Sequence, residues 1–423
     1  MLSNQTIQAY AKILEDELQV AMGCTEPIAV AYAAAYGREL LGCDPERVVA
    51  HCSGNIIKNV KAVTVPQTGG LKSIETAVLA GIHGGDASQK LEVIAQLSDE
   101  NRAQIRKDLD AGIVTVELLV SCHALHFIIE LFAGEDMVSV EIVNSHTNFG
   151  TVSKNGEILH QGLTSATEGD GEDLSFMKLA DIIAFTKEVD VELIRQPLER
   201  QIACNTAIAQ AGLTESWGAR VGQTLMAVGG DSVFNRMKAM AAAGSDARMS
   251  GCALPVVINS GSGNQGMTVS LPVISYAQSL GVSHEELLRA LCMANLTAIY
   301  QKGSIGKLSA FCGVVSAATG AVAGLAYLDK VSYEVTAMAI TNSLANIGGM
   351  VCDGAKASCA GKIASAVESA LLGYELAKQH EGFTSGEGIV GDTVDETIAN
   401  IGRMASQGMR ETDAEILKIM IGQ

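Results

Sequence analysis

The chain has 423 residues, 48% of them hydrophobic and 18% charged, so it can bury a large core as two domains or one large one. Its formal net charge of −18 excludes the basic footprint that binding to nucleic acid requires. The first residues, MLSNQTIQ, have no basic region followed by an apolar run, so we expect no secretory signal and a cytoplasmic location.

Two helices are predicted in the first 42 residues. Residues 4–22 place their apolar side chains on one stripe. In the following sequence, Gly-Cys-Thr-Glu-Pro, Thr25 suits a helix cap and Pro27 the first turn of a helix that ends near residue 41. Cys24 is then expected just before a helix N-terminus, where the thiolate form is favoured.

An α/β pattern follows from residue 43. The β-type runs are 48–52, 60–65, 113–120, 127–132 and 138–143. Residues 151–160 predict a hairpin that turns at Asn155-Gly156, and residues 72–110 predict helices between strands. The polar, acidic stretch 162–173 predicts a linker.

The remainder of the chain is predicted to be mainly helical. The expected helices include 174–189, 191–211, 217–230, 234–243 and 284–301. Capping boxes are predicted at Ser283 with Glu286 and at Thr412 with Glu415. Residues 308–328 carry no charge and could span a bilayer, but their small side chains favour a buried central helix. We therefore expect an α+β fold, with a large mainly helical domain (1–42 plus 175–423) and an inserted smaller α/β domain (43–174).

Two cysteines, Cys352 and Cys359, lie in a glycine-rich stretch before a predicted helix, for which Asp353 is a suitable N-cap. Within one helix a seven-residue step would separate them by about 10 Å. Cys352 is therefore expected in the glycine turn, folded back toward a metal site at the helix N-terminus. The alternative is two small buried side chains in an alanine-rich helix.

A glycine-rich loop at residues 259–266 contains a literal G-x-G-x-x-G. Residues 267–273 are rich in β-branched side chains and contain Pro272, so no helix is expected to follow and a dinucleotide-binding fingerprint is rejected. The remaining interpretation is that this polar loop binds a carboxylate or phosphate, with Arg248 as a bidentate anchor. A structural turn with a solvated arginine is the alternative.

Ten cysteines in a reducing compartment favour metal binding or catalysis over disulfides. The sequence has no C-x-x-C pair and no H-E-x-x-H, so no zinc pattern is present. Widely spaced cysteines suit a cluster whose ligands come from different helices, and soft thiolates select iron–sulfur, copper or zinc.

Four motifs, in the same order along nearly the whole chain, resemble the L-cysteine desulfidase family, which is related to the iron–sulfur L-serine dehydratases. These motifs are GCTEP (23–27), SDARM (245–249), NSGSGNQG (259–266) and CDGAKASC (352–359). The resemblance implies that Cys312, Cys352 and Cys359 hold a 4Fe-4S cluster with one open iron, and that Cys24 is the catalytic base. It further implies an iron–sulfur lyase that degrades L-cysteine by α,β-elimination to pyruvate, ammonia and hydrogen sulfide.

We expect the charged ends of this small amino-acid substrate to bind a set of polar side chains from two loops and the SDARM motif. They are Arg248, Ser260, Ser262, Asn264, Gln265, Asn55 and Lys58. The sequence ends KIMIGQ, without the extra cluster ligand that the serine dehydratases carry near their C-terminus, which favours cysteine as substrate over serine. Whether Cys24 is a base or a fourth cluster ligand at rest stays open.

Three other functions fit the same residues. One is an L-serine dehydratase or related β-eliminating lyase. A second is a pyridoxal phosphate enzyme with Lys302, Lys307 or Lys356 as the Schiff base. A third is a non-catalytic iron–sulfur redox sensor. We expect neither a membrane nor a nucleic acid as partner, and a homo-oligomer is left open.

Overall fold

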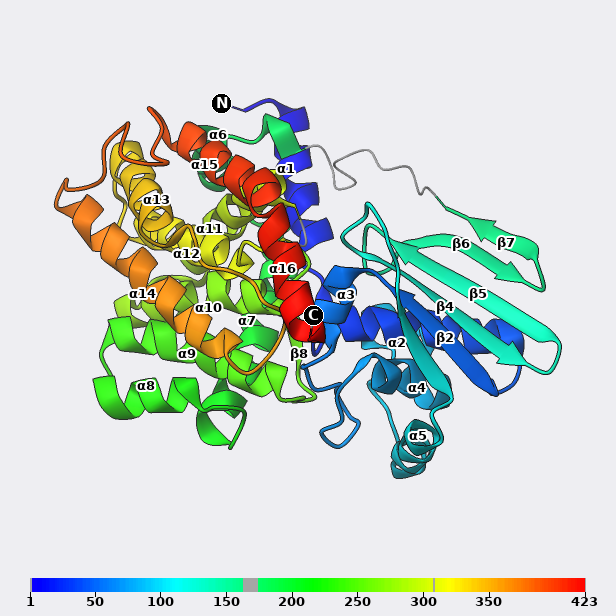
Figure 1. Cartoon of the computed structure of the whole chain (residues 1–423). Helices are drawn as coiled ribbons and strands as arrows, with labels where there is room; N and C mark the ends of the chain where they lie inside the picture. Colours follow the sequence, from blue (N-terminus) through cyan, green and yellow to red (C-terminus); the bar gives the residue numbers. More distant parts are fainter. Residues whose placement is uncertain (1, 163–173, 307–308, 423) are drawn as a thin grey trace.

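The computed structural model describes residues 2–162, 174–306 and 309–422. Figure 1 shows an α+β fold in which a large helical body lies beside a mixed sheet with its own helices. The C-terminal helix α16 (Arg410–Ile421) lies at the junction of the two parts. All but the first residue of the predicted linker at 162–173 fall outside the described residues.

The larger sheet has six strands in the order β3-β2-β4-β5-β6-β7. Strand β2 runs parallel to β3, and the other neighbouring pairs are antiparallel. The strands are β2 (Arg47–Cys52), β3 (Val114–Leu118), β4 (His126–Ala133), β5 (Asp136–Val143), β6 (Phe149–Lys154) and β7 (Glu157–Gln161). The predicted hairpin is confirmed, because Asn155 and Gly156 both take positive φ between β6 and β7.

One predicted strand is wrong. Residues 60–65 do not pair into the sheet. Ser53 follows β2 as the N-cap of the short helix α3 (Gly54–Val60), and a turn follows that helix. The apolar residues in question, Val60, Val63 and Val65, are nevertheless buried. An apolar run of this length does not by itself distinguish a strand from buried helix and turn.

One face of the sheet is covered by α2 (Thr25–Leu41) and α4 (Ile74–Gly84), which pack against each other. Their backbones approach closely, since a Cβ on Gly81 would lie 2.1 Å from the Ala31 carbonyl oxygen. The division expected at residue 42 assigned α2 to the helical part, whereas the buried side chains of α2 lie in the core of the sheet. The two-domain division itself remains a prediction.

The helical body is built around α12, which contacts α10, α11, α13 and α14. The remaining α-helices in the described residues are α1 (Asn4–Glu17), α5 (Asp99–Ala111), α6 (Leu179–Glu188), α7 (Glu192–Thr214), α8 (Val221–Gly229), α9 (Val233–Met249), α10 (Gly263–Leu280), α11 (His284–Ile305), α12 (Gly313–Leu328), α13 (Tyr333–Ile347), α14 (Cys359–Lys378) and α15 (Val394–Arg403). The predicted buried central helix is confirmed as α12. Across the described ranges, no helix has the length and apolarity needed to cross a membrane.

A two-stranded ribbon joins the first helices to the middle of the body. Strand β1 (Val20–Met22) pairs antiparallel with β8 (Pro255–Val257). The first predicted helix therefore ends at Glu17 rather than near residue 22. Gly23 and Cys24 follow β1 directly, and Thr25 Oγ1 donates to Gly261 O at 3.0 Å, which places this segment beside the loop that leads into α10.

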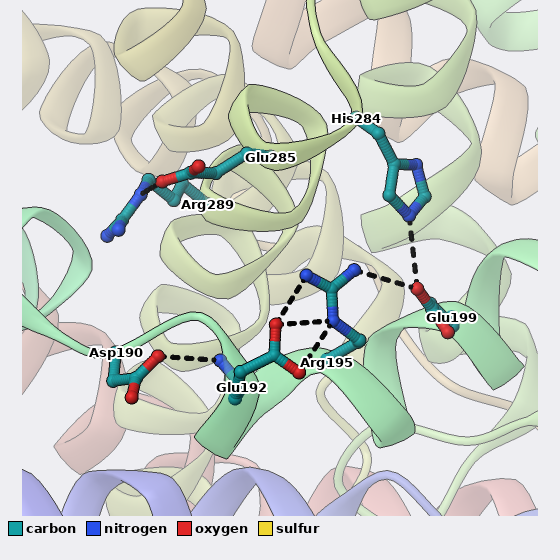
Figure 2. Close-up of polar contacts among 7 residues, drawn as sticks. All are labelled: Asp190, Glu192, Arg195, Glu199, His284, Glu285 and Arg289. Carbon is teal, nitrogen blue, oxygen red and sulfur yellow. Dashed lines mark hydrogen bonds and ion pairs between the residues drawn. The ribbon is translucent and has the colours of Figure 1, made fainter.

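Charged side chains join α7 to α11 at the surface (Figure 2). Arg195 Nη1 donates to Glu199 Oε1 at 3.1 Å, and the same oxygen lies 3.2 Å from His284 Nε2. The predicted capping box at Ser283 and Glu286 is present just before His284. The second predicted box is wrong, because α16 begins at Arg410 and Thr412 already lies inside it.

Candidate active site

A cavity of about 90 Å³ lies where the N-terminal ends of α2, α10, α12 and α14 meet. We call it the cysteine cavity. The predicted site residues that line it are Cys24, Arg248, Ser262, Asn264, Gln265, Cys312, Cys352 and Cys359. Ser260, Asn55 and Lys58 are not among its lining residues. Residues more than 300 positions apart in the sequence thus meet at one site.

Cys312 and Cys352 are brought together by pairing between two backbone segments. Cys312 N donates to Met350 O at 2.9 Å, and Cys352 N donates to Ala310 O at 2.6 Å. Their thiols share a hydrogen bond that lowers the pKa of Cys352 and raises that of Cys312. Cys312 is also the N-cap residue of α12, where the helix dipole favours negative charge.

Cys359 is the first residue of α14, and its Sγ lies 3.6 Å from the carbonyl oxygen of Gly354. Cys352 lies before this helix, as predicted. The predicted N-cap is wrong: Ser358 precedes the helix, while Asp353 forms ion pairs with Lys356 and Lys362.

Buried lysines lie close to these thiols. Lys302 lines the cavity, and burial lowers its pKa to about 8, although the nearby Cys352 and Cys312 oppose that shift. Lys58 is fully buried and forms an ion pair with Asp413 of α16. Its charge also favours the thiolate of Cys352. This ion pair attaches the C-terminal helix, and the expected role of Lys58 in binding substrate stays a prediction.

The donor set fits an iron–sulfur cluster better than a single ion. In the part of the chain that the structure describes, no three His, Cys, Asp or Glu side chains are placed to hold one metal ion. A 4Fe-4S cluster takes each thiolate on a different iron, so its ligands need not converge on one point. Three soft donors on one cavity, with cationic side chains beside them, suit such an anionic group.

Cys24 is the N-cap residue of α2, as predicted, and is 3% exposed. Its Sγ donates a hydrogen bond to Glu26 Oε2 at 3.0 Å. Burial, and then the negative charge of Glu26, raise the pKa of Cys24 well above its usual value. Burial and Glu26 thus act against the thiolate that the helix N-terminus was expected to favour.

Glu26 is the site residue that sequence reasoning missed. Burial opposes its ionisation, but nearby His146 and the Cys24 hydrogen bond hold its pKa below the usual value. His146 comes from the loop between β5 and β6, so the sheet also reaches this site. A glutamate in a first helical turn is favoured by the helix dipole whatever else it contacts, so its position in the sequence does not reveal the bond to Cys24.

Arg248 is 2% exposed and donates from Nε to the carbonyl oxygen of Gly23 at 2.8 Å. It passes close to Gly263, where a Cβ would lie 2.5 Å from the same nitrogen. The alternative of a solvated arginine is therefore wrong. The guanidinium lies beside Cys24 and lines the cavity.

The glycine loop does open a helix, contrary to the expectation from sequence. Ser262 is the N-cap of α10, which continues through Pro272. The preceding strand β8 nevertheless belongs to an antiparallel ribbon, so the parallel βαβ unit of a dinucleotide site is absent here. Asn264 Oδ1 is buried without a hydrogen-bond partner among the described residues. Ser260 instead donates to Asn259 Oδ1 at 2.9 Å.

The chain thus has a mainly helical body in which several thiols lie at helix N-termini around one cavity. Comparison with known proteins gives the family of the chain. The chain belongs to the serine dehydratase alpha chain family, whose profile matches residues 88–418. This match includes the three cysteines proposed as ligands and Arg248, whereas Cys24 and Glu26 precede it. Family membership indicates a lyase of the serine dehydratase type.

Similar proteins share the whole length of the chain. It is 49% identical to a UPF0597 protein of Lachnoclostridium phytofermentans, over 97% of this chain and 98% of the relative. A UPF0597 protein of Desulfitobacterium hafniense is 48% identical over 98% of this chain and 97% of the relative. One of Finegoldia magna is 45% identical over 97% and 99%.

Proposed function

We propose that the protein is an iron–sulfur-dependent lyase that degrades L-cysteine by α,β-elimination. The single observation that supports this most strongly is the meeting of Cys312, Cys352 and Cys359 with the Cys24–Glu26 pair on one cavity. One group of thiols is suited to hold a cluster, and the other pair is suited to proton transfer.

In this proposal Cys312, Cys352 and Cys359 hold a 4Fe-4S cluster with one open iron. When bound, that cluster supplies a Lewis acid for the substrate's sulfur or carboxylate. Lys302 lies beside these thiols and balances their negative charge. Cys312 and Cys359 lie at the N-termini of α12 and α14, whose dipoles also stabilise the thiolate form.

Two groups in the cavity are suited to the charged ends of an amino acid. Only Nε of Arg248 has a hydrogen bond within the described residues, so its terminal nitrogens are available for the substrate carboxylate. Asn264 Oδ1, which has no hydrogen-bond partner among them, can accept from the α-ammonium group. Ser262 and Gln265 complete this wall of the cavity.

Cys24 is proposed as the base that takes the proton from Cα. The resting pair holds its proton on Cys24 Sγ, so that proton must first pass to Glu26 Oε2 or to water. The thiolate then accepts the Cα proton, the Cβ–S bond breaks, and its electrons leave with sulfur as hydrosulfide. The resulting aminoacrylate tautomerises and hydrolyses to pyruvate and ammonia.

L-serine is the first alternative substrate, because family membership points to serine dehydratases and the same groups would expel water instead of sulfide. The test is anaerobic reconstitution with iron and sulfide, followed by assays of pyruvate and sulfide from L-cysteine and of pyruvate from L-serine. A higher kcat/KM for L-cysteine supports the proposal. A higher value for L-serine replaces it with a serine dehydratase.

The same preparation separates the remaining alternatives. Lys302 lines the cavity and Lys356 is bound to Asp353, while Lys307 lies outside the described residues. An internal-aldimine absorption band would establish a pyridoxal phosphate enzyme, whereas broad thiolate-to-iron absorption supports the cluster. A loaded protein that releases no pyruvate from either amino acid would instead be a redox sensor.

A further inference from the structure

A second and larger cavity, of about 340 Å³, lies in the helical body away from the cysteines. We call it the distal pocket. Its walls come from α6, α11, the C-terminal end of α12, and α13. Cys312 caps the other end of α12, about 24 Å away for a helix of 16 residues. The pocket is therefore separate from the cysteine cavity.

The base of the distal pocket is apolar. Met293, Ala326 and Leu328 are buried there, and Ile183 and Val331 form half-buried sides. A concave surface of this volume lined mainly by hydrophobic side chains is typical of small-molecule sites. Its size corresponds to about ten water-sized groups, at ~30 Å³ each.

The rim of the pocket carries two lysines. Lys187 of α6 is exposed and pairs with no carboxylate among the described residues. Lys330 lies 3.6 Å from Glu286, but that carboxylate also accepts hydrogen bonds from Ser283 N and Oγ. The rim therefore has a cationic excess, although the chain as a whole carries a formal charge of −18.

The turn that presents Lys330 is firmly held. Lys330 takes a left-handed φ of 56°, a position that glycine would occupy at lower cost. The turn closes through Val331 N to Ala326 O at 3.2 Å. Asp329 beside it accepts from the hydroxyls of Tyr276 and Tyr374, both at 2.7 Å. That carboxylate is thus already engaged by α10 and α14.

The opposite wall is held by Arg289, which Figure 2 shows beside Glu285 on α11. Arg289 Nη1 donates to the carbonyl oxygens of Thr186 at 2.7 Å and Val189 at 3.2 Å. These two bonds fix the end of α6 that carries Lys187. Both sides of the pocket are therefore formed before any ligand arrives, which reduces the entropic cost of binding.

From these observations we propose that the distal pocket binds a small carboxylate with an apolar body of about ten non-hydrogen atoms. The apolar body lies on Met293 and Leu328, and the carboxylate meets Lys187 and Lys330 at the rim. A hydrophobic amino acid and a simple aryl carboxylate share this chemistry. Glu286 offers the amino acid an additional partner for its ammonium group.

The test is calorimetric titration of the full-length protein with 3-phenylpropanoate, L-phenylalanine and the uncharged 3-phenylpropanol. We expect the carboxylates to bind, and 3-phenylpropanol to bind about tenfold more weakly than 3-phenylpropanoate. Tighter binding of L-phenylalanine would identify an amino acid as the ligand class. Tighter binding of 3-phenylpropanoate would identify a simple carboxylate. Binding does not require catalytic activity, so this test is independent of the proposed function.

Variants locate the site. Lys187→Ala is expected to weaken 3-phenylpropanoate binding about tenfold, and Val331→Trp to abolish it by filling the pocket. Lys107→Ala, which removes an exposed lysine from α5, should leave binding unchanged. No binding of any probe at millimolar concentration, or equal binding to wild type and Lys187→Ala, overturns the proposal.

Discussion

Cys24 donates a hydrogen bond from Sγ to Glu26 Oε2 at 3.0 Å, and both side chains are almost excluded from water. A thiol whose hydrogen-bond partner is a carboxylate can pass on its proton without the arrival of a further group. The pair therefore gives the proposed base a defined proton acceptor. His146 favours the charged state of that acceptor.

The role of Glu26 is tested by Glu26→Gln. Glutamine can still accept a hydrogen bond from Cys24 but cannot take its proton. We expect kcat to fall about 10²-fold, with KM and iron content nearly unchanged. The matched control is Glu75→Gln, which alters a first-turn glutamate of α4 outside the cavity. Steady-state kinetics that show wild-type kcat for Glu26→Gln would remove Glu26 from the mechanism.

The role of Cys24 is tested by Cys24→Ala. Since the ligands are proposed to be the other three cysteines of the cavity, this variant should keep its iron and brown colour but lose turnover. Metal analysis and pyruvate assays on one anaerobic preparation give both quantities. Iron loss would instead make Cys24 a cluster ligand. Cys43→Ser, at an exposed cysteine, provides the control.

A pH dependence of stability is expected from Asp246. Burial raises the pKa of this carboxyl to about 6, although Gly222 N opposes the shift by donating a hydrogen bond to Oδ2 at 3.0 Å. The folded state then binds a proton that the unfolded state has released between about pH 4 and 6. The free energy of unfolding should therefore fall as pH rises through this window, by roughly 3 kcal/mol.

Asp246→Asn removes that titration, so the variant should gain stability relative to wild type as pH rises from about 4 to 7. Chemical denaturation of both proteins in reducing buffer at several pH values measures the difference. A difference that stays constant with pH would show that Asp246 has an ordinary pKa in the folded protein.

The ion pair between Lys58 and Asp413 should stabilise the docking of α16. Asp413→Ala leaves the buried ammonium group of Lys58 without its partner and is expected to cost about 3 kcal/mol in the free energy of unfolding. Glu415→Ala breaks an exposed pair with Lys418 on the same helix and should cost about 0.5 kcal/mol or less. Equal losses in the two variants would contradict a special role for the buried pair.

Local patterns predicted much of this fold. The Asn155-Gly156 hairpin and the capping box at Ser283 were correct because short-range backbone preferences and hydrogen bonds determine them. The helix across Pro272 was missed because α10 is buried over most of its length, and packing there outweighs the poor helix propensity of individual residues. The cap at Asp353 failed because nearby lysines bind its carboxylate.

The candidate site was predicted in part. The cysteines and Arg248 were found from their motifs, and they do line one cavity. Glu26 was missed since its partner lies only two residues away, where sequence alone does not show which way the side chains point. The pairing of Lys58 with Asp413 was not visible in the sequence because the two residues lie 355 positions apart, and the assignment of Lys58 to the substrate stays a prediction.

The proposed cluster is tested most directly by counting iron and acid-labile sulfide in anaerobically reconstituted wild type and Cys312→Ala. We expect about four of each per wild-type chain, with broad thiolate-to-iron absorption, and little of either in the variant. Wild-type protein that takes up no iron, or a Cys312→Ala variant that loads as fully as wild type, would contradict it.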